Sequence, residues 1–327
     1  MGGTSLQHAS QAPLHAPEPV LEHEGAPRLP NFLVIGAARS GTTTLHYHLG
    51  QHPEIFVSPV KETNFFLWDD AGEMPPWVDE KTRRETPKTL DEYAALFAQA
   101  GRHHRAVGES SPSYLFGPIA ARIKARLPEA KLIAILRQPV EQALSMFGTW
   151  HRGLSTEQLV ERLPHALASG EPGPGGALPL KEHGQFHRHL RPFLEQFDRR
   201  QLKVVLFDDL TRNGPALFRD LFRFLGVDDS FHLEEVQQYN STGSAKSATI
   251  ERALAMTHRL KGVARAMLPD AAVRRLINLQ HRVRSANLEK TSDLSPELRR
   301  ELTRLYYSRD ITALEQAIDR DLMLWRV

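Results

Sequence analysis

The stretch NFLVIGAARSGTTTLHYHL, residues 31–49, decides the fold. It begins with a short apolar run, Phe32 to Ile35, that is typical of a buried strand. Small and hydroxyl-bearing residues follow between Gly36 and Gly41, and two leucines four residues apart then indicate the start of a helix. A strand, a glycine-rich turn and a helix start together present backbone N–H groups at the positive end of a helix. This arrangement predicts a site for a phosphate-like anion.

The spacing of the two glycines is similar to that of the Walker A loop, in which a lysine follows the second glycine. Here Thr42 takes the place of that lysine, and Thr43 follows it. In an ATPase the lysine reaches the β- and γ-phosphates, and the next hydroxyl holds Mg²⁺. The loop therefore predicts anion binding through amides and hydroxyls without the equipment for γ-phosphoryl transfer. An ordinary strand–turn–helix with a glycine-rich bend is the alternative.

Length and patterning favour an α/β fold. The chain has 327 residues, of which 41% are hydrophobic, so it can bury a sizeable core. Strand-like runs alternate with helical patterns across residues 32–225, which predicts a parallel sheet with helices on both faces. Residues 1–29 are rich in proline and lack periodicity, and we expect them to form a flexible leader. Residues 30–327 are expected to form one domain.

The charge balance and the absence of cysteine limit the kinds of ligand, cross-link and metal site that the chain can have. A net charge of +2 suits an anionic ligand but does not argue for a nucleic-acid partner. Without cysteine there are no disulfides and no thiolate metal sites, which fits a reducing compartment, and we expect a cytoplasmic protein. No apolar run approaches the ~20 residues of a membrane span, and the N-terminus lacks the pattern of a signal peptide.

Other parts of the chain predict further elements. Apolar runs predict strands over residues 55–57, 131–137 and 202–207, with a strand end near 107, and helical spacing predicts helices over residues 90–100, 119–127, 140–151, 184–197 and 215–225. Residues 69–88 and 152–182 are expected to be loops, the second because of its glycine and proline run. Residues from 250 onward are expected to be helical, and the arginine-rich part, 252–284, to present a solvated basic face, with an acceptor- or nucleic-acid-binding surface as the alternative.

Two further groups of residues carry chemistry. Arg137 ends a predicted strand, and Ser145 lies one to two turns into the following helix, where a guanidinium and a hydroxyl can bind phosphate. Lys61 and Glu62 precede an aromatic pair, so the carboxylate of Glu62 is a candidate general base in a partly dry pocket. A surface arginine in the first case and an exposed ion pair in the second are the alternatives.

In order and spacing, these pieces resemble the sulfotransferases that use 3′-phosphoadenosine 5′-phosphosulfate (PAPS). The resemblance covers about residues 32–325. The glycine-rich loop is similar to the family's 5′-phosphosulfate loop, where GTT replaces GKT, and Arg137, Pro139 and Ser145 are similar to its 3′-phosphate motif. The segments GESSPSYL, GQFHRHL, FDDL, FRFLGV and YYSRDITALE also match.

The resemblance implies a P-loop-type fold and assigns roles to individual residues. It is strongest to the heparan-type and related bacterial enzymes, in which a glutamate before His-Phe-Phe is the base, although Asn64 replaces that histidine here. Arg39 stands where those enzymes carry a loop lysine, and a fixed cation is thereby retained. The implied catalytic residues are Glu62, Lys61 and Arg39, and the implied donor-binding residues are Arg39, Ser40, Gly41, Thr42, Thr43, Thr44, Arg137, Ser145 and Lys246.

The implied reaction is in-line sulfuryl transfer from PAPS to a hydroxyl or amine, with adenosine 3′,5′-bisphosphate as the product and no metal. A small-molecule or glycan acceptor is expected: a carbohydrate, a lipid or a secondary metabolite. His151 is a rival base, with a surface histidine as the alternative. Asp208 and Asp209 are the nearest imitation of Mg²⁺ ligands, and we interpret them as a turn or helix cap. A P-loop small-metabolite kinase and a non-catalytic nucleotide-binding protein are the other candidate functions.

Overall fold

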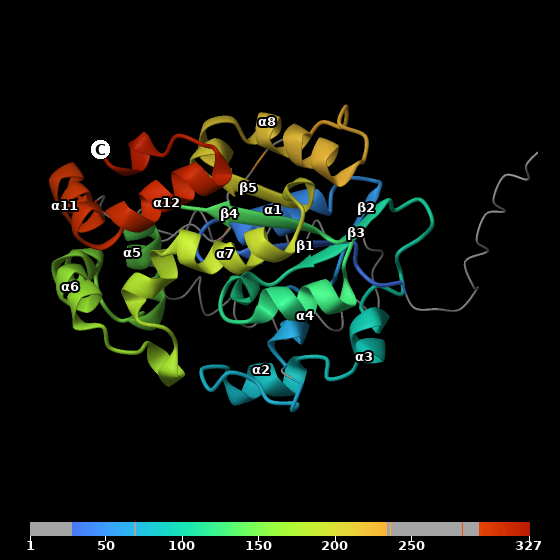
Figure 1. Cartoon of the computed structure of the whole chain (residues 1–327), viewed down its shortest axis with the longest axis horizontal. Helices are drawn as coiled ribbons and strands as arrows, with labels where there is room; N and C mark the ends of the chain where they lie inside the picture. Colours follow the sequence, from blue (N-terminus) through green and yellow to red (C-terminus); the bar gives the residue numbers. More distant parts are fainter. Residues whose placement is uncertain (1–27, 69, 234–235, 237–282, 284–293) are drawn as a thin grey trace, which may run out of the picture.

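The fold is built on one parallel sheet, and the computed structural model describes residues 28–68, 70–233, 236, 283 and 294–327. The sheet has five strands in the order β2-β3-β1-β4-β5 (Figure 1). The strands are β1 (Phe32–Gly36), β2 (Ile55–Val57), β3 (Ala106–Ser110), β4 (Lys131–Leu136) and β5 (Leu202–Leu206). The predicted α/β fold with a central parallel sheet is confirmed.

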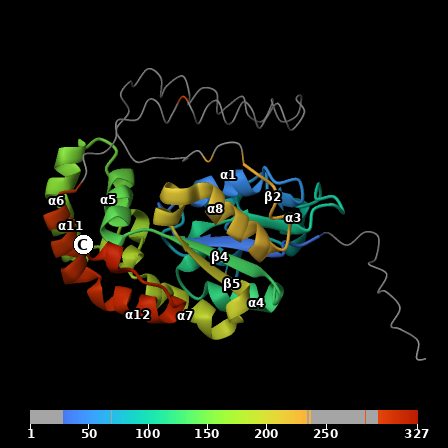
Figure 2. The same cartoon turned by 90° about the horizontal axis from the view of Figure 1, so that it is seen from above.

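Helices cover both faces of this sheet. The helices of the described chain are α1 (Thr42–Leu49), α2 (Glu80–Glu85), α3 (Leu90–Ala95), α4 (Ile119–Arg126), α5 (Pro139–Trp150), α6 (Thr156–Ser169), α7 (Phe186–Gln196), α8 (Phe207–Leu225), α11 (Pro296–Tyr306) and α12 (Ser308–Ile318). Short 3₁₀ turns lie between them: η1 (Phe65–Leu67), η2 (Pro112–Leu115), η3 (Pro174–Gly176), η4 (Leu180–Gly184), η5 (Arg199–Gln201) and η6 (Met323–Trp325). Viewed from above, α1 and α8 lie on one side of the sheet and α4, α7 and α12 on the other (Figure 2).

Burial of both sheet faces explains the continuous apolar runs of the strands. In β1, Phe32 and Val34 pack into the core formed with α1 and α8. Leu33 and Ile35 point to the opposite face and belong to the core formed with α4, α5 and α7. In the part of the chain that the structure describes, no helix is long and apolar enough to cross a membrane.

Two of the predicted loops contain helices. Residues 152–182 include α6, which begins with a capping box between Ser155 and Gln158 and buries Leu159, Leu163 and Leu167. The glycine and proline run after α6 obscured this helical spacing. Residues 69–88 include α2, whose first turn is capped by the Asp79 carboxylate accepting from the Thr82 N–H at 3.0 Å. Both helices are held by local capping signals that composition alone does not reveal.

The predicted helix over residues 215–225 is the second half of α8, which has a break in helical geometry at Asn213. The first half begins directly after β5, where the Asp209 carboxylate accepts from the Leu206 N–H at 3.0 Å, so this residue is a helix cap as predicted. Of the expected leader, residues 1–29, Arg28 and Leu29 are described, and residues 1–27 lie outside the described residues. So do Lys246 and, except for Val283, the arginine-rich segment 252–284.

Candidate active site

The candidate site lies at the carboxyl end of β1. The chain leaves β1 for β2 and β3 on one side and then crosses to β4 and β5 on the other. In open α/β sheets such a change of direction leaves a crevice beyond the strand ends, where ligands bind. The glycine-rich loop, the end of β4 and the segment after β2 all reach this edge.

The glycine-rich loop is fixed between β4 and α5. The Ala37 N–H donates to the Ile135 carbonyl at 2.7 Å, and the buried Gln142 amide donates to the Ala38 carbonyl at 3.2 Å. Gly41 takes the N-cap position of α1 with φ of 102°, a conformation that disfavours other residues. The loop therefore runs directly into a helix N-terminus, where the backbone dipoles favour an anion.

The loop residues assigned to the donor line this turn at different depths. Ser40, Thr42 and Thr44 are buried, whereas Thr43 and Gly41 are half-buried. The Ser40 hydroxyl donates to the Ala38 carbonyl at 3.4 Å, which ties the turn to itself. The buried positions leave the backbone, together with Thr43, as the surface of the loop that a ligand meets.

A hydrogen bond joins the loop to the second predicted motif. Arg39 adopts the left-handed region at φ of 63°, and its Nε donates to the Ser145 hydroxyl at 2.9 Å. These residues are separated by 106 positions in the sequence. The buried Ser145 lies on α5, and Arg137 lies just before that helix, at the end of β4. The structure thus brings Arg39 together with the pair that the sequence assigns to a phosphate.

Several positive groups act on Arg39 at once. Burial lowers the pKa of its guanidinium below the ordinary value, the charges of Arg137 and Arg152 lower it further, and Glu62 opposes them. Arg152 therefore belongs to this cluster, although the sequence analysis did not single it out. Arg152 lies in the turn just after α5 ends at Trp150, where helical spacing from Ser145 gives no signal for it. The surplus of positive charge favours an anionic ligand at this edge of the sheet.

The Arg137 side chain is held in place by its neighbours. Its Nε and Nη2 both lie 3.2 Å from one Glu141 carboxylate oxygen, and the other oxygen accepts from Arg299 at 3.3 Å. Its guanidinium carbon also lies 4.8 Å from the centre of the Phe207 ring. An arginine fixed in this way can present its remaining N–H groups to a phosphate without first being ordered.

The start of α5 is tied to a segment far along the chain. Gln138 caps this helix by accepting from the Glu141 N–H at 2.9 Å. Its amide group donates to the Thr303 hydroxyl at 2.7 Å and to the Trp325 carbonyl at 3.2 Å. The helix that carries Ser145 is therefore fixed by α11 and η6.

Lys61 and Glu62 form a direct ion pair beside this cluster. The Glu62 side chain is 51% exposed, whereas that of Lys61 is 18% exposed. Glu62 has φ of 63°, and its N–H donates to the Ser110 carbonyl at 2.9 Å at the end of β3. The expected partly dry pocket is therefore not found around Glu62, which forms the exposed ion pair that was the alternative; its carboxylate is anchored through the backbone and open to an incoming group.

A buried network beneath Glu62 was not predicted from the sequence. Glu109 is fully buried at the end of β3, and it accepts from the Ser111 hydroxyl at 2.8 Å and from the Tyr93 hydroxyl at 3.4 Å. The Ser111 oxygen in turn accepts from the Asn64 N–H at 3.1 Å. Burial raises the pKa of Glu109 to about 7, even though hydrogen bonds from Ser111 and its neighbours act in the opposite direction.

This network fixes the turn that contains the candidate base. Asn64 also has a positive φ, of 55°, so two left-handed residues flank Thr63. The Thr63 hydroxyl lies 3.1 Å from the Tyr114 hydroxyl, which also accepts from the Phe66 N–H at 3.5 Å. The side-chain oxygen of Asn64 is buried and has no hydrogen-bond partner among the residues that the structure describes.

His151, the rival base, lies at the end of α5. It is exposed, and its ring packs edge-on against Phe147 with 4.5 Å between the ring centres. Its role and those of the other assigned residues stay predictions. The structure brings Arg39, Arg137, Ser145 and Glu62 to one edge of the sheet.

Known proteins with similar sequences share one activity in their names. The chain is 36% identical over 120 residues to the membrane-associated sulfotransferase kil1 of Dictyostelium discoideum, a match that covers 36% of this chain and 22% of that protein. It is 26% identical over 211 residues to the human bifunctional heparan sulfate N-deacetylase/N-sulfotransferase 2, covering 61% of this chain and 22% of that protein. The chain thus matches about a fifth of the length of these relatives.

A solved structure and a family profile agree with these relatives. The crystal structure of a sulfotransferase from Alicyclobacillus acidocaldarius superposes with a TM-score of 0.61 at 27% identity, over 92% of this chain and 100% of that one. Residues 30–231, more than half of the chain, match the profile of the sulfotransferase family. The fold, the relatives and the profile all lead to one conclusion: the chain belongs to the sulfotransferase family.

Proposed function

We propose that this sulfotransferase moves a sulfuryl group from PAPS to a hydroxyl or amine of an acceptor, with Glu62 as the general base. The observation that carries the proposal is the 2.9 Å hydrogen bond from Arg39 to Ser145. It joins the loop suited to a 5′-phosphosulfate with the pair suited to a 3′-phosphate. A donor that carries a phosphate at both its 3′ and its 5′ position can engage both groups, whereas ATP has no 3′-phosphate for Arg137 and Ser145.

On this proposal the donor is held at two points. Arg137 and Ser145 bind the 3′-phosphate, and Lys246 is a further candidate ligand outside the described residues. The N–H groups at the start of α1, together with Thr43, bind the 5′-phosphosulfate. Arg39 lies between the two points, and its positive charge stabilises the negative charge that collects on the bridging oxygen as the bond to sulfur breaks.

The transfer step breaks the bond between sulfur and the bridging oxygen of PAPS and forms a bond between sulfur and the acceptor oxygen or nitrogen. The acceptor oxygen or nitrogen attacks sulfur in line with the leaving group, and adenosine 3′,5′-bisphosphate departs with the bonding electron pair. Glu62 takes the proton from the acceptor atom, which keeps the new ester or sulfamate neutral at that position. Lys61, paired with Glu62, adds positive charge next to the reacting groups.

The acceptor is proposed by class only. Relatives in the comparison are named for N-sulfation of heparan sulfate, an amine on a glycan. An amine or hydroxyl on a carbohydrate is therefore the first acceptor class to try, followed by lipid and secondary-metabolite hydroxyls. A screen with ³⁵S-labelled PAPS against these three classes reports transfer directly.

Ligand-dependent unfolding tests the donor. Adenosine 3′,5′-bisphosphate at a hundred times its dissociation constant is expected to raise the unfolding free energy by about 2.7 kcal/mol, whereas Mg-ATP at the same concentration leaves it unchanged. Stabilisation by Mg-ATP and not by the bisphosphate contradicts the proposal and favours a kinase.

Substitution of Glu62 tests the base. In the presence of an accepted acceptor, Glu62→Gln is expected to lower kcat by about 10²- to 10⁴-fold and to leave the affinity for adenosine 3′,5′-bisphosphate unchanged. Glu301→Gln, at an exposed position on α11, is the matched control. Full turnover by Glu62→Gln assigns the proton to another residue, and His151→Asn is then the next variant.

A further inference from the structure

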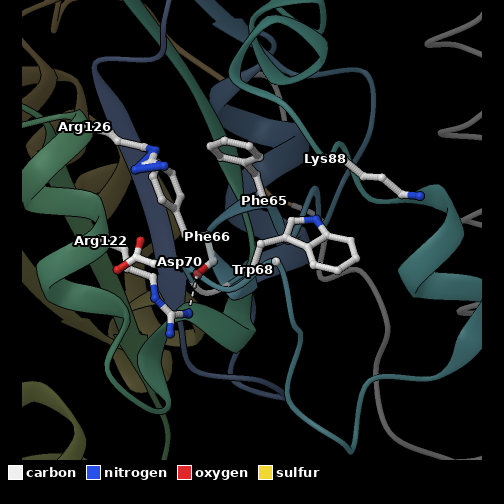
Figure 3. A pocket seen from close by; sticks show the side chains of 8 residues that line it. Phe65, Phe66, Trp68, Asp70, Lys88, Arg122 and Arg126 are labelled. Carbon is white, nitrogen blue, oxygen red and sulfur yellow. Dashed lines mark hydrogen bonds between the residues drawn. The ribbon is translucent and has the colours of Figure 1, made fainter.

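A second pocket lies between η1, α4 and the segment that precedes α3. Its volume is about 430 Å³, which is within the range of small-molecule sites. In Figure 3 Arg122 and Arg126 extend from α4 on one side, Lys88 lies on the opposite side, and aromatic rings lie between them. None of the lining residues belongs to the donor-binding loop or to α5.

The middle of the pocket is apolar and fixed in shape. It is lined by Phe65, Phe66 and Trp68, and Trp68 presents the most surface because Phe65 and Phe66 are only 6% and 2% exposed. Phe65 stacks on Tyr93 with 4.4 Å between ring centres, and the indole N–H of Trp68 donates to the Pro87 carbonyl at 2.9 Å. These contacts hold the rings before any ligand arrives, so a planar apolar group can pack here with little loss of side-chain freedom.

The rim of the pocket carries more positive than negative charge. Arg122 and Arg126 are one helical turn apart on α4, and Asp70 is the one carboxylate among the described lining residues. Across the described part of the chain, no carboxylate lies within 4.0 Å of the cationic groups of Arg122, Arg126 or Lys88. Two neighbouring guanidinium groups beside an apolar wall are suited to an oxyanion on an apolar body.

We propose that this pocket binds a small molecule with a planar apolar body and a single oxyanion group. The Trp68 ring, with the small accessible parts of Phe65 and Phe66, takes the body, and the Arg122–Arg126 pair takes the charged end. Lys88, on the far side, adds attraction for the same anion. This pocket lies apart from the donor site, and binding there does not depend on the reaction proposed above.

Arg122 connects this pocket to the turn that carries the candidate base. One of its terminal nitrogens donates to the carbonyls of Phe66 and Leu67, at 3.3 Å each. These carbonyls belong to η1, which begins directly after Asn64. An anion that bonds the remaining N–H groups of Arg122 therefore acts on a side chain that already holds η1.

Calorimetric titration of the full chain tests the proposal with naphthalene-2-sulfonate as the probe. Naphthalene-2-methanol has the same body without the charge, and inorganic sulfate has the charge without the body. The sulfonate is expected to bind at least about tenfold more tightly than either of them, since a charge-assisted contact and an apolar contact are both made. Equal affinity for the sulfonate and either partial probe overturns the proposal.

Substitution and competition locate the probe. Arg126→Gln, at an exposed residue for which the described structure shows no side-chain hydrogen bond, is expected to weaken sulfonate binding by about tenfold. Arg304→Gln, at an exposed position on α11, is the matched control and should leave binding unchanged. Saturation with adenosine 3′,5′-bisphosphate should not displace the probe. Displacement, or unchanged binding by Arg126→Gln, places the probe elsewhere and refutes the assignment.

Discussion

Replacement of Glu109 by glutamine is expected to change how stability depends on pH. In the folded chain burial raises the pKa of this carboxyl from its ordinary value of 4.5 to about 7. Between these two values the unfolded chain releases the proton while the folded chain retains it, so the folded state loses stability as the pH rises. The interval is about 2.5 pH units, and about 1.4 kcal/mol per unit gives a loss of about 3 kcal/mol.

Glutamine carries no charge at any of these pH values, so the variant escapes this loss. The unfolding free energy of Glu109→Gln minus that of the wild type is therefore expected to increase by about 3 kcal/mol between pH 4.5 and 8. Urea denaturation followed by circular dichroism, at intervals of half a pH unit, measures this difference. Any constant penalty from the altered hydrogen bonds shifts the whole curve without changing its slope.

A second buried group makes the comparison between variants necessary. Burial lowers the pKa of His183 to about 4, so its contribution to stability is lost as the pH falls from 6.5 toward 4, opposite in sign to that of Glu109. His183 is present in both proteins and cancels in the difference. Glu301→Gln removes an exposed carboxyl and should give a flat difference. A flat difference for Glu109→Gln as well would refute the reasoning from burial.

Three further substitutions test the loop, the unexpected helix and the phosphate pair. Gly41→Ala puts a residue with a Cβ at φ of 102°, and that Cβ lies 3.1 Å from a Phe207 ring carbon. Thermal unfolding should therefore show a decrease of about 1–3 kcal/mol in the unfolding free energy. The control, Gly153→Ala, has open space around the new Cβ and should change the unfolding free energy by no more than about 0.5 kcal/mol. Leu163→Ala removes a fully buried side chain of α6 and should lower the unfolding free energy, measured by urea denaturation, by about 2–5 kcal/mol. The control, Leu305→Ala, removes a side chain that is 54% exposed and should lower it by about 0.5 kcal/mol or less. Similar losses for the two leucines would show that α6 is not packed as described. Ser145→Ala should weaken adenosine 3′,5′-bisphosphate binding about tenfold in calorimetry but leave adenosine 5′-monophosphate unaffected, and equal weakening of both would argue against a contact to the 3′-phosphate.

The central elements could be predicted because their signals are local. The apolar run and glycine spacing around Gly36 and Gly41 specify a strand, a turn and a helix within one short stretch. The parallel sheet follows from the alternation of such stretches. The positions of Arg137 and Ser145 on these elements could be predicted for the same reason, because a strand end and the first turns of a helix are defined by neighbouring residues.

Other parts depend on contacts that no short stretch contains. Glu109 looks like an ordinary strand residue, and its burial requires Tyr93 from α3 and Ser111 from the following turn. Arg152 joins the site only because α5 continues past Ser145 toward the loop. The helix α6 was not predicted for a different reason: its Ser155–Gln158 capping box is local, but the glycine and proline run at residues 170–176 gives the whole segment the composition of a loop.

The contacts of Gln138 have a consequence for the order in which the protein is made. This residue fixes the helix of Ser145 by reaching Thr303 and Trp325, which lie 165 and 187 positions later. Contacts over such separations form late, because a long loop must close before they contribute. On the ribosome, the glycine-rich loop emerges long before the segment that steadies its partner helix. A nascent chain is therefore expected to acquire affinity for its anionic ligand only once residues 294–327 have left the ribosome, so ligand binding can report that this segment has docked on α5.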